Sequence, residues 1–267
     1  MSDISESTPV ADVAAHALRD RFDLIEAHLP GAANAYPGGI HDVHQLRVST
    51  RRAAAALRVF EEFLPEKRVG KIRKLLRSIR RAAGPARDLD VLYGRLAEPL
   101  SNRRCAEAIE LLSFILQQRQ AVQPPLRKLL KQQLGAKLER QATKLLKSMQ
   151  HSELVDTPTL AQFAPCALNP LVKGFFEASE RDLSVPHWLH QLRIEGKRLR
   201  YALELLSEGC DESLRLDVYP VFVEVQDRLG DINDHTTAIH LFTDWRKNTA
   251  KKQRSFLKKM IRSEKKE

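Results

Sequence analysis

Two segments of the chain carry histidine and arginine at matching positions, and these residue types favour the binding of anions. The matching bases are His44, Arg47, Arg51 and Arg52 in the first segment, and His190, Arg193, Lys197 and Arg198 in the second. The planar arginine fork can donate two hydrogen bonds to phosphate oxygens, whereas lysine acts as a point charge. A neutral imidazole can donate one N–H, and we expect its pKa to rise beside many negative charges.

The offset of 146 residues between these segments continues far beyond them. Without a gap it aligns Leu57 with Leu203, Gly84 with Gly230 and Asp88 with Asp234. One register held over about fifty residues predicts an internal duplication. Homologous halves usually pack about a pseudo-twofold axis, so we expect the matching helices to face each other.

The segments that carry these residues have helical periodicity, and no segment predicts a strand. We therefore expect an all-α protein with a first helical bundle at residues 8–150, a linker at 151–169 and a second bundle at 170–267. In the first bundle the helices are expected at roughly 8–29 and 41–64, then one ending at Gly84-Pro85, one capped by Asp88, and two at 101–122 and 124–150. In the second they are expected at roughly 170–182, 187–207, 214–229, 234–245 and 247–263, with Asp234 as an N-cap.

The first basic segment has a spacing that places its bases together. His44, Arg47 and Arg51 follow each other at i, i+3 and i+7, which is one face of a helix, and Arg58 extends that face by two turns. This face borders the apolar face, so the bases point into a groove between helices. In the second segment Arg200 and Tyr201 follow one turn after Lys197.

Further basic stripes occur on other expected helices. They are Lys74, Arg77 and Arg81; Lys137, Arg140, Lys144 and Lys147; and Lys247, Lys251, Arg254, Lys258 and Arg262. Like charges at this spacing destabilise a helix by roughly 0.2–0.5 kcal/mol per pair, which favours a compensating anion. The alternative, a solvated basic face, fits the C-terminal stripe best. Because Lys74, Arg77 and Arg81 align with Pro220, Val223 and Asp227, we expect more positive charge from the first half.

The composition agrees with a polyanionic partner. The 267 residues include 44 Lys and Arg against 34 Asp and Glu, a formal net charge of +10, which favours nucleic acid, an anionic membrane or a phosphate polymer. Three widely spaced cysteines fit neither a disulfide framework nor a zinc site. With a polar, acidic N-terminus and no run of about 20 apolar residues, we expect a cytoplasmic protein without membrane contact.

Candidate catalytic and metal-binding groups are weak. The pair His41-Asp42 is also found in metal-dependent phosphohydrolases, but an aspartate in the first turn of a helix is explained by the macrodipole. Asp231, Asp234, His235 and His240 could gather a cation, but capping of a helix explains Asp234 more simply. No Gly-rich phosphate loop or nucleophile elbow is present. We expect no catalytic residue, no metal and no cofactor.

The paired pattern His-x-x-Arg-Val/Ile-x-x-Arg/Lys-Arg resembles the CHAD domain family, over nearly the whole chain from about residue 8. Residues 84–91 are similar to the family's Arg-Asp-x-Asp-Val element, and residues 230–234 are a weaker second copy. The resemblance implies two helical bundles around a basic channel that binds inorganic polyphosphate, in bacteria at polyphosphate granules. It also implies that His44, Arg47, Arg51, His190, Arg193 and Lys197 face inward.

The leading hypothesis is therefore a polyphosphate-binding protein that is not an enzyme. Nucleic-acid binding is an alternative that the net charge allows, but it favours exposed bases interleaved with stacking aromatics, and aromatic residues make up only 6% of the chain. A phosphohydrolase is a second alternative, disfavoured because the general base and metal ligands are missing. The oligomeric state, the preferred chain length and the choice between storage, granule targeting and regulation stay open.

Overall fold

The structure is a computed structural model that describes residues 4–34, 39–103, 105–150, 157–247 and 251–266. These residues form helices and no strand, apart from one isolated bridge between Pro9 and Thr159. The α-helices are α1 Val10–Ala33, α2 Ile40–Val59, α3 Glu66–Asn102, α4 Ala106–Ala121, α5 Pro124–Lys131, α6 Leu134–Gln150, α7 Leu160–Ser179, α8 Pro186–Leu206, α9 Tyr219–Lys247 and α10 Lys251–Glu264. Short helical turns are η1 Glu61–Phe63, η2 Ser207–Gly209 and η3 Leu214–Val218. The expected all-α class is confirmed.

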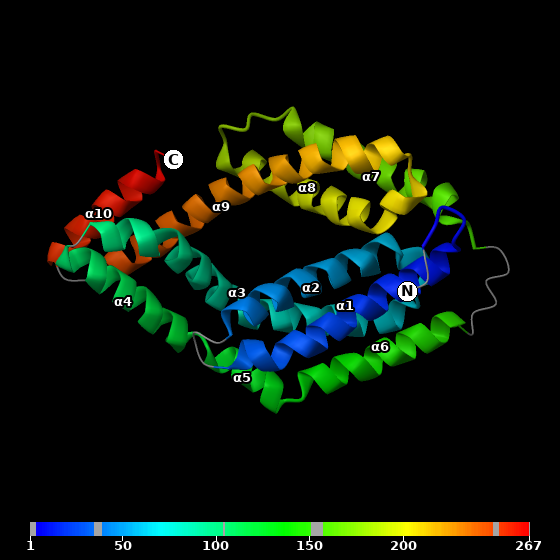
Figure 1. The fold of residues 1–267 in the computed structure, drawn as a ribbon, viewed down its shortest axis with the longest axis horizontal. Helices are drawn as coiled ribbons and strands as arrows, with labels where there is room; N and C mark the ends of the chain where they lie inside the picture. Colours follow the sequence, from blue (N-terminus) through cyan, green and yellow to red (C-terminus); the bar gives the residue numbers. More distant parts are fainter. Residues whose placement is uncertain (1–3, 35–38, 104, 151–156, 248–250, 267) are drawn as a thin grey trace.

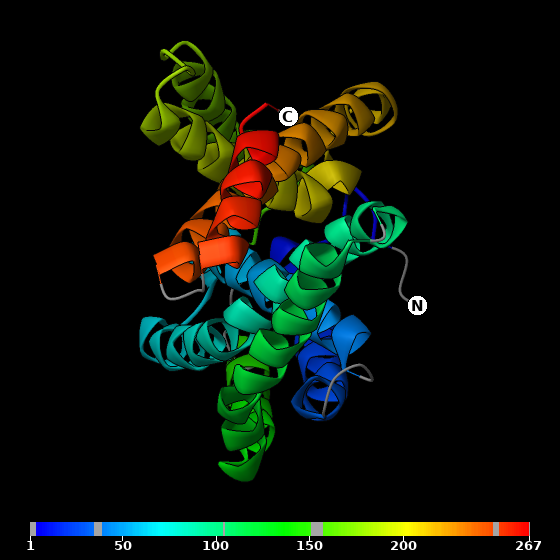
Figure 2. The same ribbon diagram turned by 90° about the vertical axis from the view of Figure 1, so that its left-hand side faces the viewer.

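The helices form two layers (Figure 1). One layer holds α1, α2, α5, α6 and the first part of α3, and the other holds α7, α8 and the first part of α9. In each layer a central helix packs between two others: α2 packs on α1 and α3, and α8 packs on α7 and α9. The two central helices also contact each other. Viewed from the end where α4 and α10 lie, one layer stands above the other (Figure 2).

The expected helix breaks at Gly84-Pro85 and near residue 230 are wrong, because α3 and α9 run through them. Asp88 and Asp234 therefore lie inside helices and cap nothing. In α3 the apolar period continues across the break through the buried residues Ala83, Ala86 and Leu89, and burial outweighs local propensity. Gly84 instead leaves room for the side chain of Arg47, because a Cβ at this position would lie 3.1 Å from a guanidinium nitrogen of Arg47.

Two further boundaries differ from expectation. The helix expected at 124–150 is divided at Gln133, whose positive φ of 53° ends α5 and lets the chain turn into α6. The expected linker 151–169 is helical from Leu160, because Thr159 and Gln162 form a reciprocal capping box there. Residues 151–156 of that linker lie outside the described residues.

The two expected bundles share a core at one end. Leucines of α3, such as Leu92 and Leu96, pack with Phe242 of α9 and with Phe256 and Met260 of α10. The end of the chain thus packs on the α3–α4 hairpin of the first half. The domain ranges 8–150 and 170–267 stay predictions, and so does the duplication.

A buried ion pair stabilises the part of α3 that follows Asp88. The Arg119 Nε donates to Asp90 Oδ1 at 2.7 Å, and its Nη1 donates to Gln123 Oε1 at 2.6 Å. The Gln123 amide donates in turn to the carbonyl oxygens of Ala32 and Asn34. Helices α3 and α4 are thereby tied to the end of α1.

Candidate functional site

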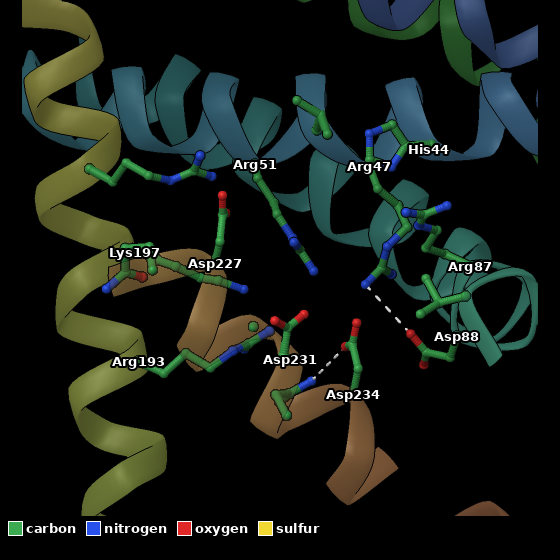
Figure 3. Close-up of a pocket in the computed structure, with 16 residues that line it drawn as sticks. His44, Arg47, Arg51, Arg87, Asp88, Arg193, Lys197, Asp227, Asp231 and Asp234 are labelled. Carbon is green, nitrogen blue, oxygen red and sulfur yellow. Dashed lines mark hydrogen bonds and ion pairs between the residues drawn. The ribbon is translucent and has the colours of Figure 1, made fainter. Parts of the chain in front are cut away.

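A pocket of about 360 Å³ lies between the two layers, where α2 and α3 face α8 and α9 (Figure 3). From α2 and α3 it is lined by His44, Arg47, Val48, Arg51, Arg87, Asp88 and Val91. From α8 and α9 it is lined by Arg193, Lys197, Arg200, Gln226, Asp227, Gly230, Asp231, Asn233 and Asp234. We call this the central pocket. Residues related by the 146-residue offset, such as Arg47 and Arg193, thus line the same space.

The bases of the central pocket are close enough to repel one another across the two layers. Burial, and then the neighbouring Arg51, lower the pKa of Arg193. The pKa of Lys197 falls to about 7, because of burial first and then the charges of Arg193 and Arg51. Burial and the charges of neighbouring bases both disfavour the charged forms of these residues, so an anion that entered between them would be bound favourably.

The pKa of His44, the histidine of the first segment, is also lowered. Burial, and then the charges of Arg87 and His41, lower the pKa of His44. The rise expected from the sequence needs a bound polyanion, and the protein alone supplies none. In the pocket without an anion His44 therefore favours its neutral form, which has one N–H to donate.

The central pocket also contains four carboxylates, which sequence reasoning placed elsewhere. Asp88 comes from α3, and Asp227, Asp231 and Asp234 come from α9. An oxygen of Asp88 lies 3.9 Å from a guanidinium nitrogen of Arg47, which is a long ion pair. Burial raises the pKa of Asp88 although Arg47 and Arg51 act to lower it. With six Lys and Arg against four Asp, the lining keeps an excess of positive charge.

Some polar atoms of the lining are buried and, within the described chain, have no hydrogen-bond partner. They are Nε of Arg193, Nε of Arg200 and both amide atoms of Gln226. The Gln226 side chain occupies space next to the buried Gly196, where a Cβ would overlap the amide. A small residue in α8 therefore lets Gln226 reach the pocket wall.

Several residues expected in the site lie beside the pocket and do not line it. Arg52 donates through Nε to Glu204 at 2.8 Å, and Glu204 lies 3.7 Å from Arg200. The buried Tyr201 ring lies under the Arg200 guanidinium, 4.9 Å from its centroid. Both contacts orient Arg200. His190, by contrast, is exposed and absent from the lining.

The remaining expected bases lie farther out. Arg58 lines a second pocket of about 330 Å³ between α2, α7 and α8, together with Arg198. Lys74, Arg77 and Arg81 are exposed on α3, and Lys137, Arg140 and Lys144 are exposed on α6, which lies at the outer edge of its layer (Figure 1). Neither of these two stripes lines the central pocket.

Sequence reasoning missed two arginines of α3. Arg87 lines the central pocket, and Arg80 lies near it, since burial and then Arg51 lower the pKa of Arg80. The signal was present: Arg73, Arg80 and Arg87 follow each other every seven residues, next to Ile72, Ile79 and Ala86. The break expected at Gly84 divided this stripe, so the sequence predicted Lys74, Arg77 and Arg81 as the basic stripe of this helix.

In the described part of the chain, no group of three or more His, Cys, Asp or Glu is arranged to hold a metal ion. Over the same residues, no helix combines the length and the apolar character that crossing a membrane requires.

The chain is similar to one family model and to solved structures of other proteins. The family model described as the CHAD domain matches residues 16–243. The crystal structure of the CHAD domain from the plant Ricinus communis is similar with a TM-score of 0.78 and 21% identity, covering 98% of this chain and 87% of that one. PptA from Streptomyces chartreusis is similar with a TM-score of 0.65 and 17% identity, covering 96% and 94%. No curated protein matches.

Proposed function

We propose, since the chain belongs to the CHAD domain family, that it binds inorganic polyphosphate in the central pocket and catalyses no reaction on it. The observation that carries this proposal is the convergence of Arg47, Arg51, Arg193 and Lys197 from two facing helices on one space. Such a site binds a flexible polyanion by replacing its counterions with fixed bases. The arginines bind phosphate oxygens bidentately, and Lys197 adds a charge when it is protonated.

The basic surface continues beyond the pocket, which favours a polymer over a single phosphate. Arg80 lies close enough to Arg51 and Arg58 for their charges to lower its pKa, after the larger effect of burial. Arg58 in turn neighbours Arg198. A chain that leaves the central pocket along α2 thus meets further bases. From the family resemblance we also propose a cytoplasmic location at polyphosphate granules.

Nucleic acid remains the alternative that the net charge allows. The described lining of the central pocket contains no aromatic ring on which a base could stack, apart from the imidazole of His44. Tyr201, the nearest aromatic candidate from the sequence, is buried under Arg200. The lining therefore favours a polymer that presents only phosphate.

A competition experiment tests the proposal. Labelled polyphosphate is bound to the protein and displaced by unlabelled polyphosphate, DNA, RNA or heparin. We expect polyphosphate to displace the label at concentrations at least about tenfold lower, per charge, than the other polyanions, since the lining offers bases for phosphate and, apart from His44, no aromatic ring for a nucleobase. Equal displacement by all four would contradict the proposal. Release of phosphate from polyphosphate or ATP with magnesium or manganese would contradict the absence of catalysis.

A further inference from the structure

In the first half of the molecule, α6 covers the outer surface between α1 and α3. It packs against both helices, and its buried residues are Leu134, Leu138, Ala142, Leu145 and Met149. Ile72, Ile79 and Ala86 of α3 belong to the same buried cluster as these residues, and each has no exposed surface. The outward face of α6 carries the bases Lys137, Arg140 and Lys144.

The second half has the same three helices without that cover. Helix α8 packs between α7 and α9 as α2 does between α1 and α3, but α6 has no counterpart among the described residues. The offset of 146 residues matches Ile72 with Val218, Ile79 with Val225 and Ala86 with Ile232. These three are 51%, 39% and 44% exposed. Three fully buried positions of the first half are thus exposed in the second.

Further exposed apolar residues occur on α9 and on α7, which contacts it. Val221, 62% exposed, lies on the same face of α9 as Val225, four residues before it, and three residues after Val218, which ends η3. Across from them, α7 exposes Val172 and Phe176. The two helices are joined by an edge-to-face contact of Phe175 with Phe222, with ring centroids 5.0 Å apart. We call the surface formed by Val172, Phe176, Val218, Val221, Val225 and Ile232 the open groove.

The charges beside the open groove indicate what would cover it. Asp217, Glu224 and Asp231 follow each other every seven residues, and each stands one residue before an exposed apolar residue, Val218 at the end of η3 or Val225 and Ile232 of α9. Glu224 is paired with Arg228, but within the described chain no base lies within ion-pair distance of Asp217 or Asp231. In the first half, the position of Asp217 is occupied by Lys71. The border of the open groove is therefore acidic.

We propose that the open groove binds a basic amphipathic helix of a partner protein, in the place that α6 occupies in the first half. The apolar stripe of such a helix covers Val218, Val225 and Ile232, and its flanking lysines or arginines lie beside Asp217 and Asp231. A second copy of this face fits less well, because two acidic borders would meet. The proposal does not depend on polyphosphate binding, because none of the apolar residues of the open groove lines the central pocket, although Asp231 borders both sites.

A peptide with the α6 sequence, residues 134–150, is the probe, because it has the required apolar stripe and basic flanks. Its labelled form is titrated with the full-length protein, and binding is followed by fluorescence anisotropy. We expect saturable binding that Val225→Lys weakens at least tenfold. Val221→Lys serves as the second variant should Val225→Lys fail to fold, and Ile109→Lys on α4, where Ile109 is 62% exposed, serves as the matched control that leaves binding unchanged.

A second peptide with Lys137, Arg140 and Lys144 replaced by glutamate keeps the apolar stripe and tests the charge. We expect it to bind at least tenfold more weakly. The proposal is overturned if the α6 peptide does not bind, if both groove variants bind it as the unmodified protein does, or if the charge-reversed peptide binds equally. Sedimentation velocity is run alongside: a dimer that Val225→Lys abolishes would identify a second copy as the occupant and overturn the proposal too.

Discussion

The two halves contribute unequal charge to the central pocket. From the first half, α2 and α3 supply three arginines and one carboxylate, Asp88. From the second, α8 supplies Arg193, Lys197 and Arg200, but α9 supplies three aspartates. Helices α2 and α8 both supply bases at positions 146 residues apart, whereas the charges that α3 and α9 supply differ. More positive charge was expected from the first half because of Lys74, Arg77 and Arg81, but these residues lie outside the pocket. The difference in charge comes instead from the aspartates of α9, among them Asp227, which matches Arg81.

The halves also differ in the contacts of the residues that follow Asp88 in α3 and Asp234 in α9. Asp90 is paired with the buried Arg119, whereas its counterpart Thr236 is exposed and bonds only to its own helix in the described chain. Arg119→Met leaves a buried carboxylate without its partner, which we expect to lower the free energy of unfolding by about 3–5 kcal/mol. Denaturant titration measures this. Lys173→Met, which removes an exposed pair with Glu177, is the control, and we expect a change below about 1 kcal/mol. Equal losses would show that the buried pair does not stabilise the first half.

Reversing one base in each half compares the two copies directly. We expect Arg193→Glu and Arg47→Glu each to weaken polyphosphate binding by about 100-fold or more, because a bidentate contact is lost and a repulsive charge is added where screening is weak. We expect losses of similar size in these two variants, since Asp88 offsets part of the Arg47 charge and Asp234 offsets part of the Arg193 charge. Lys258→Glu changes the net charge equally at an exposed site on α10, and we expect less than about a threefold effect. Circular dichroism checks folding. Similar losses in all three variants would mean that attraction is not localised in the pocket.

Lys197 occupies the position that matches Arg51, and we expect it to make polyphosphate binding depend on pH. The pKa of Lys197 is lowered to about 7, so the free protein loses this charge as the pH rises through 7, and bound polyphosphate raises that pKa. Binding therefore takes up a proton, and we expect affinity to fall about tenfold between pH 6.5 and pH 8.5. The lowered pKa of His44 adds to this fall only at the acidic end. Lys197→Arg should flatten the profile above pH 7. A profile that is equally steep in this variant would assign the proton to another group.

Removing a carboxylate tests the acidic side of the comparison. Asp88→Asn frees Arg47 from its long ion pair, and Asp234→Asn makes the same change at the matching position of α9. We expect each to strengthen polyphosphate binding about threefold, the size of one weak charge interaction. Equilibrium binding at low salt gives the measurement. Weaker binding in either variant would indicate that these aspartates orient the bases.

The periodicity of the apolar residues was sufficient to predict the helices and the position of the repeated bases on α2 and α8. One error, the break expected at Gly84-Pro85, occurred where a local signal opposed burial. Gly84-Pro85 has the composition of a helix end, but Ala83, Ala86 and Leu89 are buried on both sides of it, and α3 continues. That boundary divided the stripe that contains Arg80 and Arg87 and made Asp88 an expected cap, and the break expected near residue 230 did the same for Asp234. Which stripe faces the pocket depends on the packing of the two layers, and a single sequence does not contain it.

The salt dependence of polyphosphate binding tests most directly that one bound chain contacts both halves. The slope of log affinity against log salt counts the phosphates that the protein neutralises, at roughly 0.7 per contact for a flexible single strand. We predict that Arg47→Ala and Arg193→Ala each reduce the slope by about one contact, that the double variant reduces it by about two, and that Lys258→Ala leaves it unchanged. A slope that stays the same in the double variant, or that is flat in the unmodified protein, would contradict binding in the central pocket.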